Sequence, residues 1–354
     1  MAVLLVSFGL HDSIAEIVNN QYKNIWTYSA SGAIDDKLTY EEQKKHAEEM
    51  MAEEKDITDA LFARLTSIDA SSETGEKTVN LFTVEDPVRM ESYLHLHDRV
   101  TKEPYTLTDE GVIITEKLAY TLDVSVGDTL TLKLDDTTFR DVKITAIAEN
   151  YMMHYVYITP ELYRELYGEM PEFNQIYLQF AENTDSNEEK ALAESILGNE
   201  MVNSVSLVTE LQATVDDMMN ALNLVVWVLI IAAGLLVFVV LFNLNNINIS
   251  ERRRELASLK VLGFYDPEVA MYVYRENIFL TLFGIIAGVF MGTWLHRYTI
   301  LTLEVDMIMF GRNISMASYL YSSLFTVFFS ILVNLGMYYK LKQIDMVESL
   351  KSVE

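Results

Sequence analysis

The chain contains no cysteine, so it forms no disulfide bond and offers no thiolate ligand to a metal ion. It also lacks the HExxH, GxSxG and Walker A motifs of zinc proteases, serine hydrolases and P-loop ATPases. These absences predict a protein with no catalytic residue, no metal site and no cofactor of its own.

Basic residues are scarce, and the resulting negative charge belongs to one part of the chain. The net charge is −26, with 26 Lys and Arg against 52 Asp and Glu. Residues 11–220 hold 42 of the acidic and 16 of the basic residues, whereas the remainder is neutral. An acidic surface argues against nucleic acid as a partner. It allows a cationic peptide, a metal ion or a basic partner protein, beside the simpler interpretation of a solubilising surface.

Long apolar runs dominate the C-terminal third. Residues 224–242 and 278–295 carry no charge, and the first run, as a helix of nineteen residues, is about 28 Å long, close to the thickness of a bilayer's hydrocarbon core. The short segment between the runs is rich in Arg and Lys, which places it on the cytoplasmic side. We predict a domain at 218–354 with spans at 222–246, 273–297 and 317–340, an external loop at 298–316 and a cytoplasmic tail at 341–354.

Residues 1–10 (MAVLLVSFGL) are apolar but too few to cross a membrane. They lack the basic segment and the small-residue cleavage site of a secretory signal. We interpret them as the remnant of a spanning helix that leads into an extracytoplasmic domain at 11–217. On this interpretation the sequence holds three complete spans.

Residues 250–263 (SERRRELASLKVLG) predict a short amphipathic helix between two spans. Ser250 can serve as its N-cap, and Gly263 can take the left-handed conformation that ends a helix. Leucines recur at every third position, at Leu256, Leu259 and Leu262. This spacing indicates one apolar face beside the arginines. From these residues alone, a docking element for a partner and a topology anchor at anionic lipid headgroups are equally well supported.

The sequence ERRRELASLKVLGF, followed by YRENIFLTLFGIIAGVFMG and by the closing KLKQIDMVESLKSVE, resembles the C-terminal permease domain of the FtsX/MacB family of ABC transporters. The resemblance covers residues 222–354. It implies a permease subunit whose partners are a cytoplasmic ABC ATPase subunit, which hydrolyses the ATP, and a second permease copy or homologue. The residues implied to couple to the ATPase are Glu251, Arg252, Arg253, Arg254, Glu255, Leu256, Leu259, Lys260, Leu262 and Gly263. The resemblance also includes Arg275 and Glu276, a membrane-interface pair that would lock this helix to the span.

Two sets of small or polar residues recur at four-residue spacing within predicted spans, which places each set on one helical face. They are Gly284, Gly288 and Gly292 in one span, and Thr326, Ser330 and Asn334 in another. Each face fits either ordinary packing among the spans or a moving interface with a second permease subunit.

Residues 11–217 alternate strand and helix patterns, which predicts an α+β domain with a mixed or antiparallel sheet. We predict strands at 21–29, 79–84, 111–115, 129–134, 138–148, 155–158, 174–180 and 202–207, and helices at 39–65, 116–122, 160–167 and 187–197. The stretch GVIITEKLAYTLDVSVGDTLTLKL resembles the MacB periplasmic core domain. His95, His97 and Asp98 suggest metal ligands only in part, because a site needs a third and a fourth ligand in space, and we interpret them as a surface loop.

These features predict a multi-pass α-helical membrane domain with an extracytoplasmic α+β domain, located in the cell membrane and surrounded by membrane lipid. The predicted function is a permease subunit that transmits ATPase-driven motion across the membrane. The work done could be export or extraction of a lipid, lipoprotein or peptide, or control of a cell-wall factor. The alternative is a membrane-anchored sensor or scaffold whose acidic domain binds a ligand.

Overall fold

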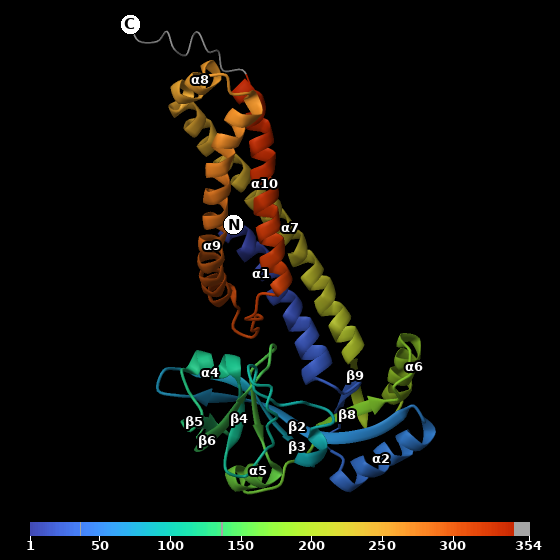
Figure 1. Ribbon diagram of the computed structural model, residues 1–354. Coiled ribbons are helices and arrows are strands. Elements are labelled where there is room, and N and C mark those ends of the chain that lie inside the picture. Colours follow the sequence, from blue (N-terminus) through green and yellow to red (C-terminus); the bar gives the residue numbers. More distant parts are fainter. Residues whose placement is uncertain (36, 136, 343–354) are drawn as a thin grey trace. The chain divides into compact units, whose positions relative to one another are not determined.

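The computed structural model of the protein describes residues 1–35, 37–135 and 137–342 (Figure 1). The chain divides into two compact units. What we call the membrane unit consists of Met1–Ala15, Met219–Leu303 and the chain from Gly311 onward. What we call the sheet unit consists of Glu16–Met218 and Glu304–Phe310. Most of the predicted tail, from residue 343, lies outside the described residues.

Four long helices carry the apolar segments of the chain. They are α1 (Ala2–Asn19), α7 (Val208–Glu251), α9 (Asp266–Leu303) and α10 (Met316–Lys342), with the short α8 (Arg253–Val261) between α7 and α9. The stretches long and apolar enough to cross a membrane are Ala2–Ile25, Asn223–Glu251, Asp266–Leu303 and Met316–Tyr338. Large apolar side chains such as Phe283 and Phe290 are about three-quarters exposed on these helices, as expected of surfaces that face lipid.

The first helix extends beyond residue 10, where the predicted remnant of a span was expected to end. Helix α1 continues to Asn19 and passes into the π-helix η1 (Asn20–Ile25). Polar residues follow position 10, but the helix then continues with the apolar residues Ile14, Ile17 and Val18, whose side chains are buried. The described residues therefore include four candidate spans, whereas the sequence predicted three.

The segment predicted as an external loop at 298–316 is also shorter than expected. Helix α9 continues through 298–303 (YTILTL), which contains no glycine or proline to end a helix. Helix α7 begins at Val208, directly after the last strand, so that a 44-residue helix joins the sheet unit to the turn before α8. Of the remaining loop, Glu304–Phe310 belongs to the sheet unit.

The sheet unit is an α+β fold built on one sheet of nine strands. The strands are β1 (Ala30–Ile34), β2 (Ile57–Ser71), β3 (Glu76–Val84), β4 (Val112–Thr115), β5 (Thr129–Lys133), β6 (Phe139–Ala148), β7 (Tyr155–Ile158), β8 (Gln175–Phe180) and β9 (Val202–Leu207). The helices are α2 (Tyr40–Glu53), α3 (Pro87–Met90), α4 (Glu116–Leu122), α5 (Pro160–Tyr167) and α6 (Ser186–Leu197). The strand order is β3-β7-β4-β6-β5-β2-β8-β1-β9, and β3 also pairs with β2. The sheet is mixed, because β3–β7 and β4–β6 are parallel and the other pairs are antiparallel.

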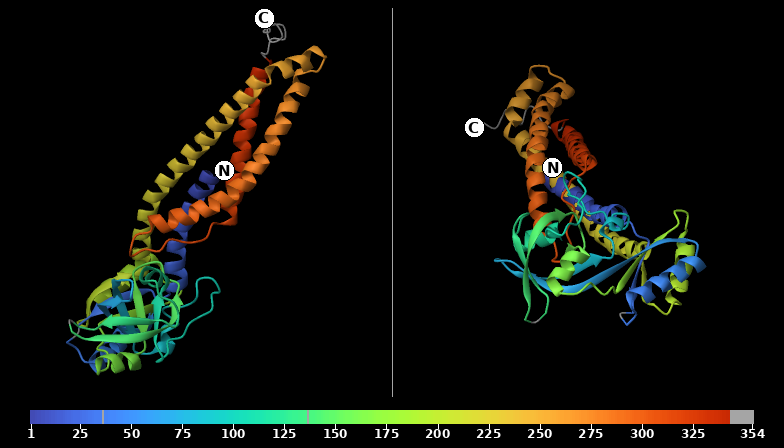
Figure 2. Two further views of the ribbon diagram at one scale, coloured as in Figure 1. Left: turned by 90° about the vertical axis from the view of Figure 1, so that its left-hand side faces the viewer. Right: turned by 90° about the horizontal axis from the view of Figure 1, so that it is seen from below.

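The extra pairing of β3 with β2 divides the sheet into two lobes that share β2. What we call the barrel lobe is the closed ring β2-β3-β7-β4-β6-β5, whose core includes residues of α4 and α5. What we call the helix-backed lobe is β2-β8-β1-β9, whose core includes residues of α2 and α6. Strand β2 gives Ile68 and Ala70 to the first core, and Ile57, Ala60 and Phe62 to the second. Helices α2 and α6 lie at the same end of the sheet unit in Figures 1 and 2.

Most predicted elements of this unit are confirmed to within one residue at each end, from β4 through β9. Two predictions are wrong. The helix expected at 39–65 ends at Glu53. The residues from Ile57 onward instead form the start of β2, which pairs with β8 and packs in the core of the helix-backed lobe. The strand expected at 21–29 is instead η1 and the turn after it, and the first strand begins at Ala30.

Candidate functional site

Helix α8 lies in the turn between α7 and α9 and packs through one side only. Leu256 and Ala257 are fully buried. Leu256 belongs to an apolar cluster with residues of α7, α9 and α10: Ile249, Val269, Ala270, Val273, Val333 and Met337. Ser250 is not the N-cap, because α7 continues to Glu251 and the Ser250 hydroxyl donates to the Asn246 carbonyl within that helix. Arg252 occupies the N-cap position of α8.

Two ion pairs hold the ends of α8. Both terminal nitrogens of Arg252 contact the Glu276 carboxylate on α9, at 2.5 and 3.2 Å. At the other end, Lys260 Nζ lies 2.9 Å from Asp266 Oδ1, at the start of α9. Arg275 is exposed, and adjacent helical residues point in different directions, so the partner of Glu276 comes from the turn before α8 and not from the neighbouring residue.

The sequence predicted that the three leucines share one apolar face, but in the structure they do not. Leu256 is buried, Leu259 is half-buried and Leu262 is 75% exposed. A step of three residues turns an α-helix by less than a full revolution, so the side chains drift away from the packed side. Gly263 has φ +97°, as predicted for a helix-ending glycine.

The turn after α8 presents a patch of exposed apolar side chains that we call the α8 tip. It consists of Val261, Leu262, Phe264 and Tyr265, of which Leu262 and Tyr265 are each 75% exposed. Arg253, Arg254 and Glu255 at the other end of α8 are also exposed. An apolar tip beside charged side chains, on a helix fixed at both ends, is a surface suited to binding another protein.

A polar cluster joins α7, α9 and α10 within the spans. The Asn334 side-chain oxygen accepts hydrogen bonds from the amides of Asn245, at 3.4 Å, and Asn277, at 3.2 Å. Tyr274 donates to the Asn334 carbonyl, and Ser330 pairs with Thr281 on α9 at 3.0 Å. Thr326 differs, because its hydroxyl donates to the Ser322 carbonyl within α10 at 2.8 Å and lies 3.4 Å from the sulfur of Met1, directly before α1. The predicted polar face of α10 therefore contacts two different helices.

The glycine face of α9 is divided in the same way. A Cβ atom on Gly288 would lie 2.5 Å from the Met1 side chain, and one on Gly292 would lie 2.9 Å from Leu5. A Cβ atom on Gly284 would meet no atom of the described residues within 4 Å. Two of the three glycines thus allow α1 to approach α9 closely.

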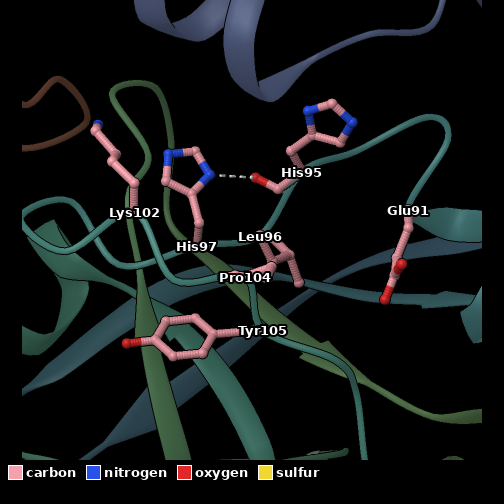
Figure 3. Close-up of a pocket in the computed structure, with 7 residues that line it drawn as sticks. All are labelled: Glu91, His95, Leu96, His97, Lys102, Pro104 and Tyr105. Carbon is pink, nitrogen blue, oxygen red and sulfur yellow. Dashed lines mark hydrogen bonds between the residues drawn. The ribbon is translucent and has the colours of Figure 1, made fainter.

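The sheet unit has a pocket of about 380 Å³, lined by Glu91, His95, Leu96, His97, Lys102, Pro104 and Tyr105 (Figure 3). His95 is exposed and its Nδ1 lies 3.0 Å from the Asn24 carbonyl oxygen. Lys102 has φ +60°, an uncommon backbone conformation for a residue other than glycine. No group of three or more potential metal-ligating side chains lies together among the described residues, in this pocket or elsewhere.

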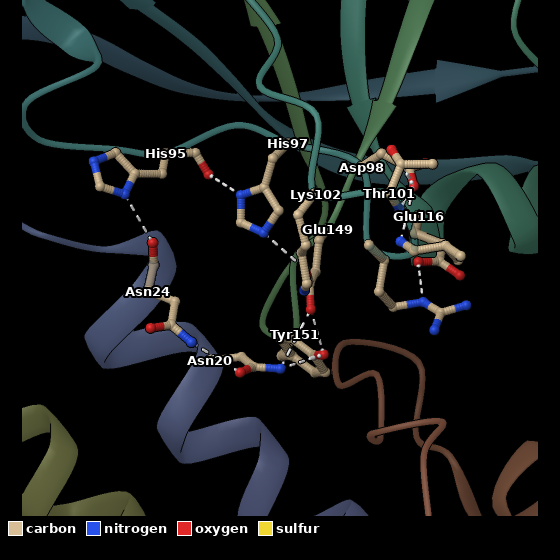
Figure 4. Close-up of polar contacts among 12 residues, drawn as sticks. Asn20, Asn24, His95, His97, Asp98, Thr101, Lys102, Glu116, Glu149 and Tyr151 are labelled. Carbon is tan, nitrogen blue, oxygen red and sulfur yellow. Dashed lines mark hydrogen bonds and ion pairs between the residues drawn. The ribbon is translucent and has the colours of Figure 1, made fainter.

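Beside this pocket, Glu149 is the centre of a buried network that the sequence did not indicate (Figure 4). Its carboxylate, 1% exposed, accepts hydrogen bonds from His97 Nε2 at 2.8 Å, Lys102 Nζ at 2.5 Å and the Tyr151 hydroxyl at 2.6 Å. Burial raises the pKa of Glu149, but these hydrogen bonds outweigh burial and lower the pKa overall. The other ring nitrogen of His97, Nδ1, lies 3.1 Å from the His95 carbonyl oxygen.

Comparison with known proteins identifies the helical part of the chain. Residues 227–346 match the model of the FtsX-like permease C-terminal family. The C-terminal part of the chain is an FtsX-like permease domain. An uncharacterized ABC transporter permease of Methanocaldococcus jannaschii is 29% identical over 176 residues, which are 48% of this chain and 43% of that protein. The chain thus spans less than half the length of this relative. With its four apolar helices, it is a multi-pass membrane protein.

Two solved structures resemble this chain at low identity. The periplasmic region of MacB from Actinobacillus actinomycetemcomitans is 12% identical, with a TM-score of 0.36, over 56% of this chain and 97% of that one. The extracellular domain of the noncanonic ABC-type transporter YknZ from Gram-positive bacteria is 12% identical, with a TM-score of 0.32, over 51% and 98% of the two chains.

Within the permease domain, the structure brings together several of the residues chosen from the sequence. Arg252 meets Glu276, and Ser330 and Asn334 meet α9. The structure also shows a buried contact that the sequence did not predict. His296 Nε2 on α9 lies 3.1 Å from the Ser13 hydroxyl on α1, and the two residues are far apart in the chain. A histidine within the predicted span 273–297 was the one signal that could have pointed to it.

Proposed function

We propose that this permease is a subunit of an ABC-type complex in which a cytoplasmic ATPase binds α8. Movement of α8 would then pass along α7 and α9 to the sheet unit on the other side of the membrane. The comparisons support the ATPase as partner. The matching family is one of permeases, and the relative from Methanocaldococcus jannaschii is described as an ABC transporter permease.

The observation that carries the proposal is the way α8 is held. The pairs Arg252–Glu276 and Lys260–Asp266 fix its two ends to α9, and Leu256 fixes its middle to the apolar cluster. A push on the exposed α8 tip is therefore delivered to α7 and α9 rather than absorbed in a flexible loop. A simple topology anchor would need the basic residues but not this rigid attachment.

Chain order supports the proposed sidedness. One crossing by α7 separates the sheet unit from α8, so the two are expected on opposite sides of the membrane. The basic residues around α8 favour the cytoplasm for that turn. The acidic sheet unit, from Glu16 to Met218, is then extracytoplasmic.

The spans favour work outside the membrane over a wide aqueous pathway. Tyr274, Asn277, Ser330 and Asn334 are hydrogen-bonded to side chains or backbone of the bundle itself. Polar groups already engaged with one another in this way do not replace the hydration shell of a hydrophilic solute. We propose that the complex acts on a lipid, lipoprotein or peptide, or on a cell-wall factor, at the outer side.

Site-specific photo-crosslinking tests the proposal. A photoreactive phenylalanine analogue replaces Leu262 in the α8 tip and, as a matched control, Val100 in the sheet unit, which is equally exposed at 75%. After irradiation of cells that express the full chain, crosslinked products are identified by mass spectrometry. We expect an ABC ATPase at position 262 and none at position 100. Crosslinking at neither position, or ATPase at position 100, would overturn the proposal.

Sidedness is measured separately with cysteine variants, which label cleanly because the chain has no cysteine of its own. In intact cells, a membrane-impermeant maleimide should label Val126→Cys in the sheet unit and should not label Ser258→Cys on α8. Labelling of Ser258→Cys from outside would contradict the proposed orientation.

A further inference from the structure

The segment Glu304–Phe310, which we call the connector, joins α9 to α10 and is part of the sheet unit. It runs antiparallel to the turn before β7. Met153 N donates to the Met307 carbonyl at 2.7 Å, Met309 N donates to the Tyr151 carbonyl at 2.9 Å, and Met152 pairs with Ile308. The Met309 side chain is 1% exposed. The connector is therefore built into the fold like a short strand and is not a loose surface loop.

A buried ion pair fixes the first residue of the connector. Glu304 Oε2 lies 2.6 Å from Lys117 Nζ on α4, and the two side chains are 0% and 9% exposed. The other carboxylate oxygen accepts a hydrogen bond from Phe310 N at 3.0 Å, which closes the connector on itself. A buried carboxylate is costly unless it is paired and hydrogen-bonded, so withdrawal of the connector would leave Lys117 with an uncompensated charge.

A second ion pair holds the middle of the connector. Asp306 accepts from Lys77 Nζ on β3 at 2.8 and 2.9 Å. His154, at the start of β7 and only 3% exposed, lies beside the same carboxylate, with Nε2 3.8 Å from Asp306 Oδ1. The connector is thus attached to α4, to β3 and to the turn before β7.

All of these attachments belong to the barrel lobe. The π-helix η1, which follows α1, also reaches this lobe, because Gln21 donates to Asn150 and accepts from Tyr151 N. Helix α7, by contrast, continues directly from β9 of the helix-backed lobe, and Val208 N bonds to the Ser29 carbonyl there. The two lobes meet in β2 and have separate apolar cores.

We propose that the connector is a force-bearing attachment through which α9 and α10 move the barrel lobe, while α7 moves the helix-backed lobe. A shift of α9 and α10 relative to α7 then bends the sheet unit about β2. This inference rests on the proposed function, since the shift is the one that ATP binding would produce. It names the route by which the movement enters the sheet unit and the pair, Lys117 and Glu304, that positions it.

The test measures the distance between the lobes in the full complex of permease and ATPase. Spin labels are placed on Leu197→Cys at the end of α6 and on Val126→Cys in the barrel lobe, both exposed positions. Pulsed EPR distances are compared without nucleotide and with ATP plus vanadate. Lys117→Met removes the buried pair, and Lys117→Arg offers a conservative rescue. Lys190→Met is the control, because Lys190 on α6 pairs with Glu210 on α7 and both side chains are more than half exposed, at 61% and 57%.

We expect a nucleotide-dependent change of distance in the parent protein and in the Lys190→Met variant. We expect it to be lost in Lys117→Met, to return in Lys117→Arg, and ATP hydrolysis to continue throughout. Amide exchange of the connector should rise about tenfold or more in Lys117→Met alone, because its opening becomes less costly. Should Lys117→Met fail to fold, Asp306→Asn at the half-exposed second ion pair gives a milder release.

The outcomes separate the two proposals. If no ATPase binds the parent chain, the proposed function is overturned. ATP hydrolysis with no change of distance in the parent protein overturns the connector's role. So does a change that persists in Lys117→Met when exchange shows that the connector has been released.

Discussion

Arg252, in the turn that begins α8, forms a bidentate ion pair with Glu276 in the first turns of α9. Charge reversal tests its role. Arg252→Glu places two carboxylates together and should separate α8 from α9, whereas Arg252→Glu combined with Glu276→Arg restores the pair. We expect nucleotide-dependent transport or ATPase stimulation to fall severalfold in the single variant and to recover in the double variant.

The partial exposure of both side chains limits the effect on stability. Arg252 and Glu276 side chains are 36% and 39% exposed, so their pair contributes only about 1 kcal/mol or less to the free energy of unfolding. A coupling role therefore predicts a large change in ATPase stimulation with a small change in melting temperature. Arg275→Glu is the matched control at the exposed neighbour, and an equal loss in that variant would argue against the specific pair.

The close approach of α1 to α9 depends on Gly292 and not on Gly284. Gly292→Leu forces its side chain into Leu5, whereas Gly284→Leu adds a side chain where no described atom lies within 4 Å. We expect Gly292→Leu to destabilise the bundle by about 1–3 kcal/mol, as overpacking does. Thermal unfolding in detergent measures the difference, and equal melting temperatures for the two variants would contradict the packing role.

The Asn334 cluster should specify how three spans pack. Asn334→Leu leaves the amides of Asn245 and Asn277 without their shared acceptor. Interhelical hydrogen bonds in membranes contribute about 0.6–1.7 kcal/mol, so we expect a loss of that order in thermal unfolding. Leu335→Ala, one residue further along and 60% exposed, is the control and should change the melting temperature less.

The sequence predicted local features well where one signal decides them. The start of α5 at Pro160 and the left-handed Gly263 follow from residue types whose backbone preferences are strong. The prediction of a helix through residue 65 was wrong because the apolar residues of this stretch fit both the helical and the strand period. Only the pairing with β8 reveals that Ile57 begins a strand.

Contacts between distant residues could not be predicted, because charge alone does not choose a partner. Glu276 has an arginine beside it in the chain and another twenty-four residues earlier, and the structure selects the earlier one. Glu149 and Glu304 are two among 52 acidic residues, and nothing local marks them as buried. Their importance comes from desolvation and from partners that the fold supplies.

His154 makes the stability of the sheet unit depend on pH near neutrality. Burial lowers its pKa below the ordinary 6.5, and the nearby cations of Lys77 and Lys117 act in the same direction, whereas Asp306 opposes them. Below pH 6.5 the unfolded chain therefore binds a proton that the folded chain does not, so stability falls as the pH drops through that value and is constant above it. Asp306, whose pKa is lowered mainly by the hydrogen bond from Lys77, stays ionised over this range.

Urea unfolding of the full chain between about pH 5 and pH 8 measures this dependence. His154→Phe removes the titrating ring from a site where neither of its nitrogens has a hydrogen-bond partner among the described residues. The variant should lose the decline below pH 6.5 and be at least as stable as the parent protein there. His95→Phe, at an exposed position, serves as the control and should keep the decline. A parent protein whose stability is flat across this range would contradict a neutral, buried His154.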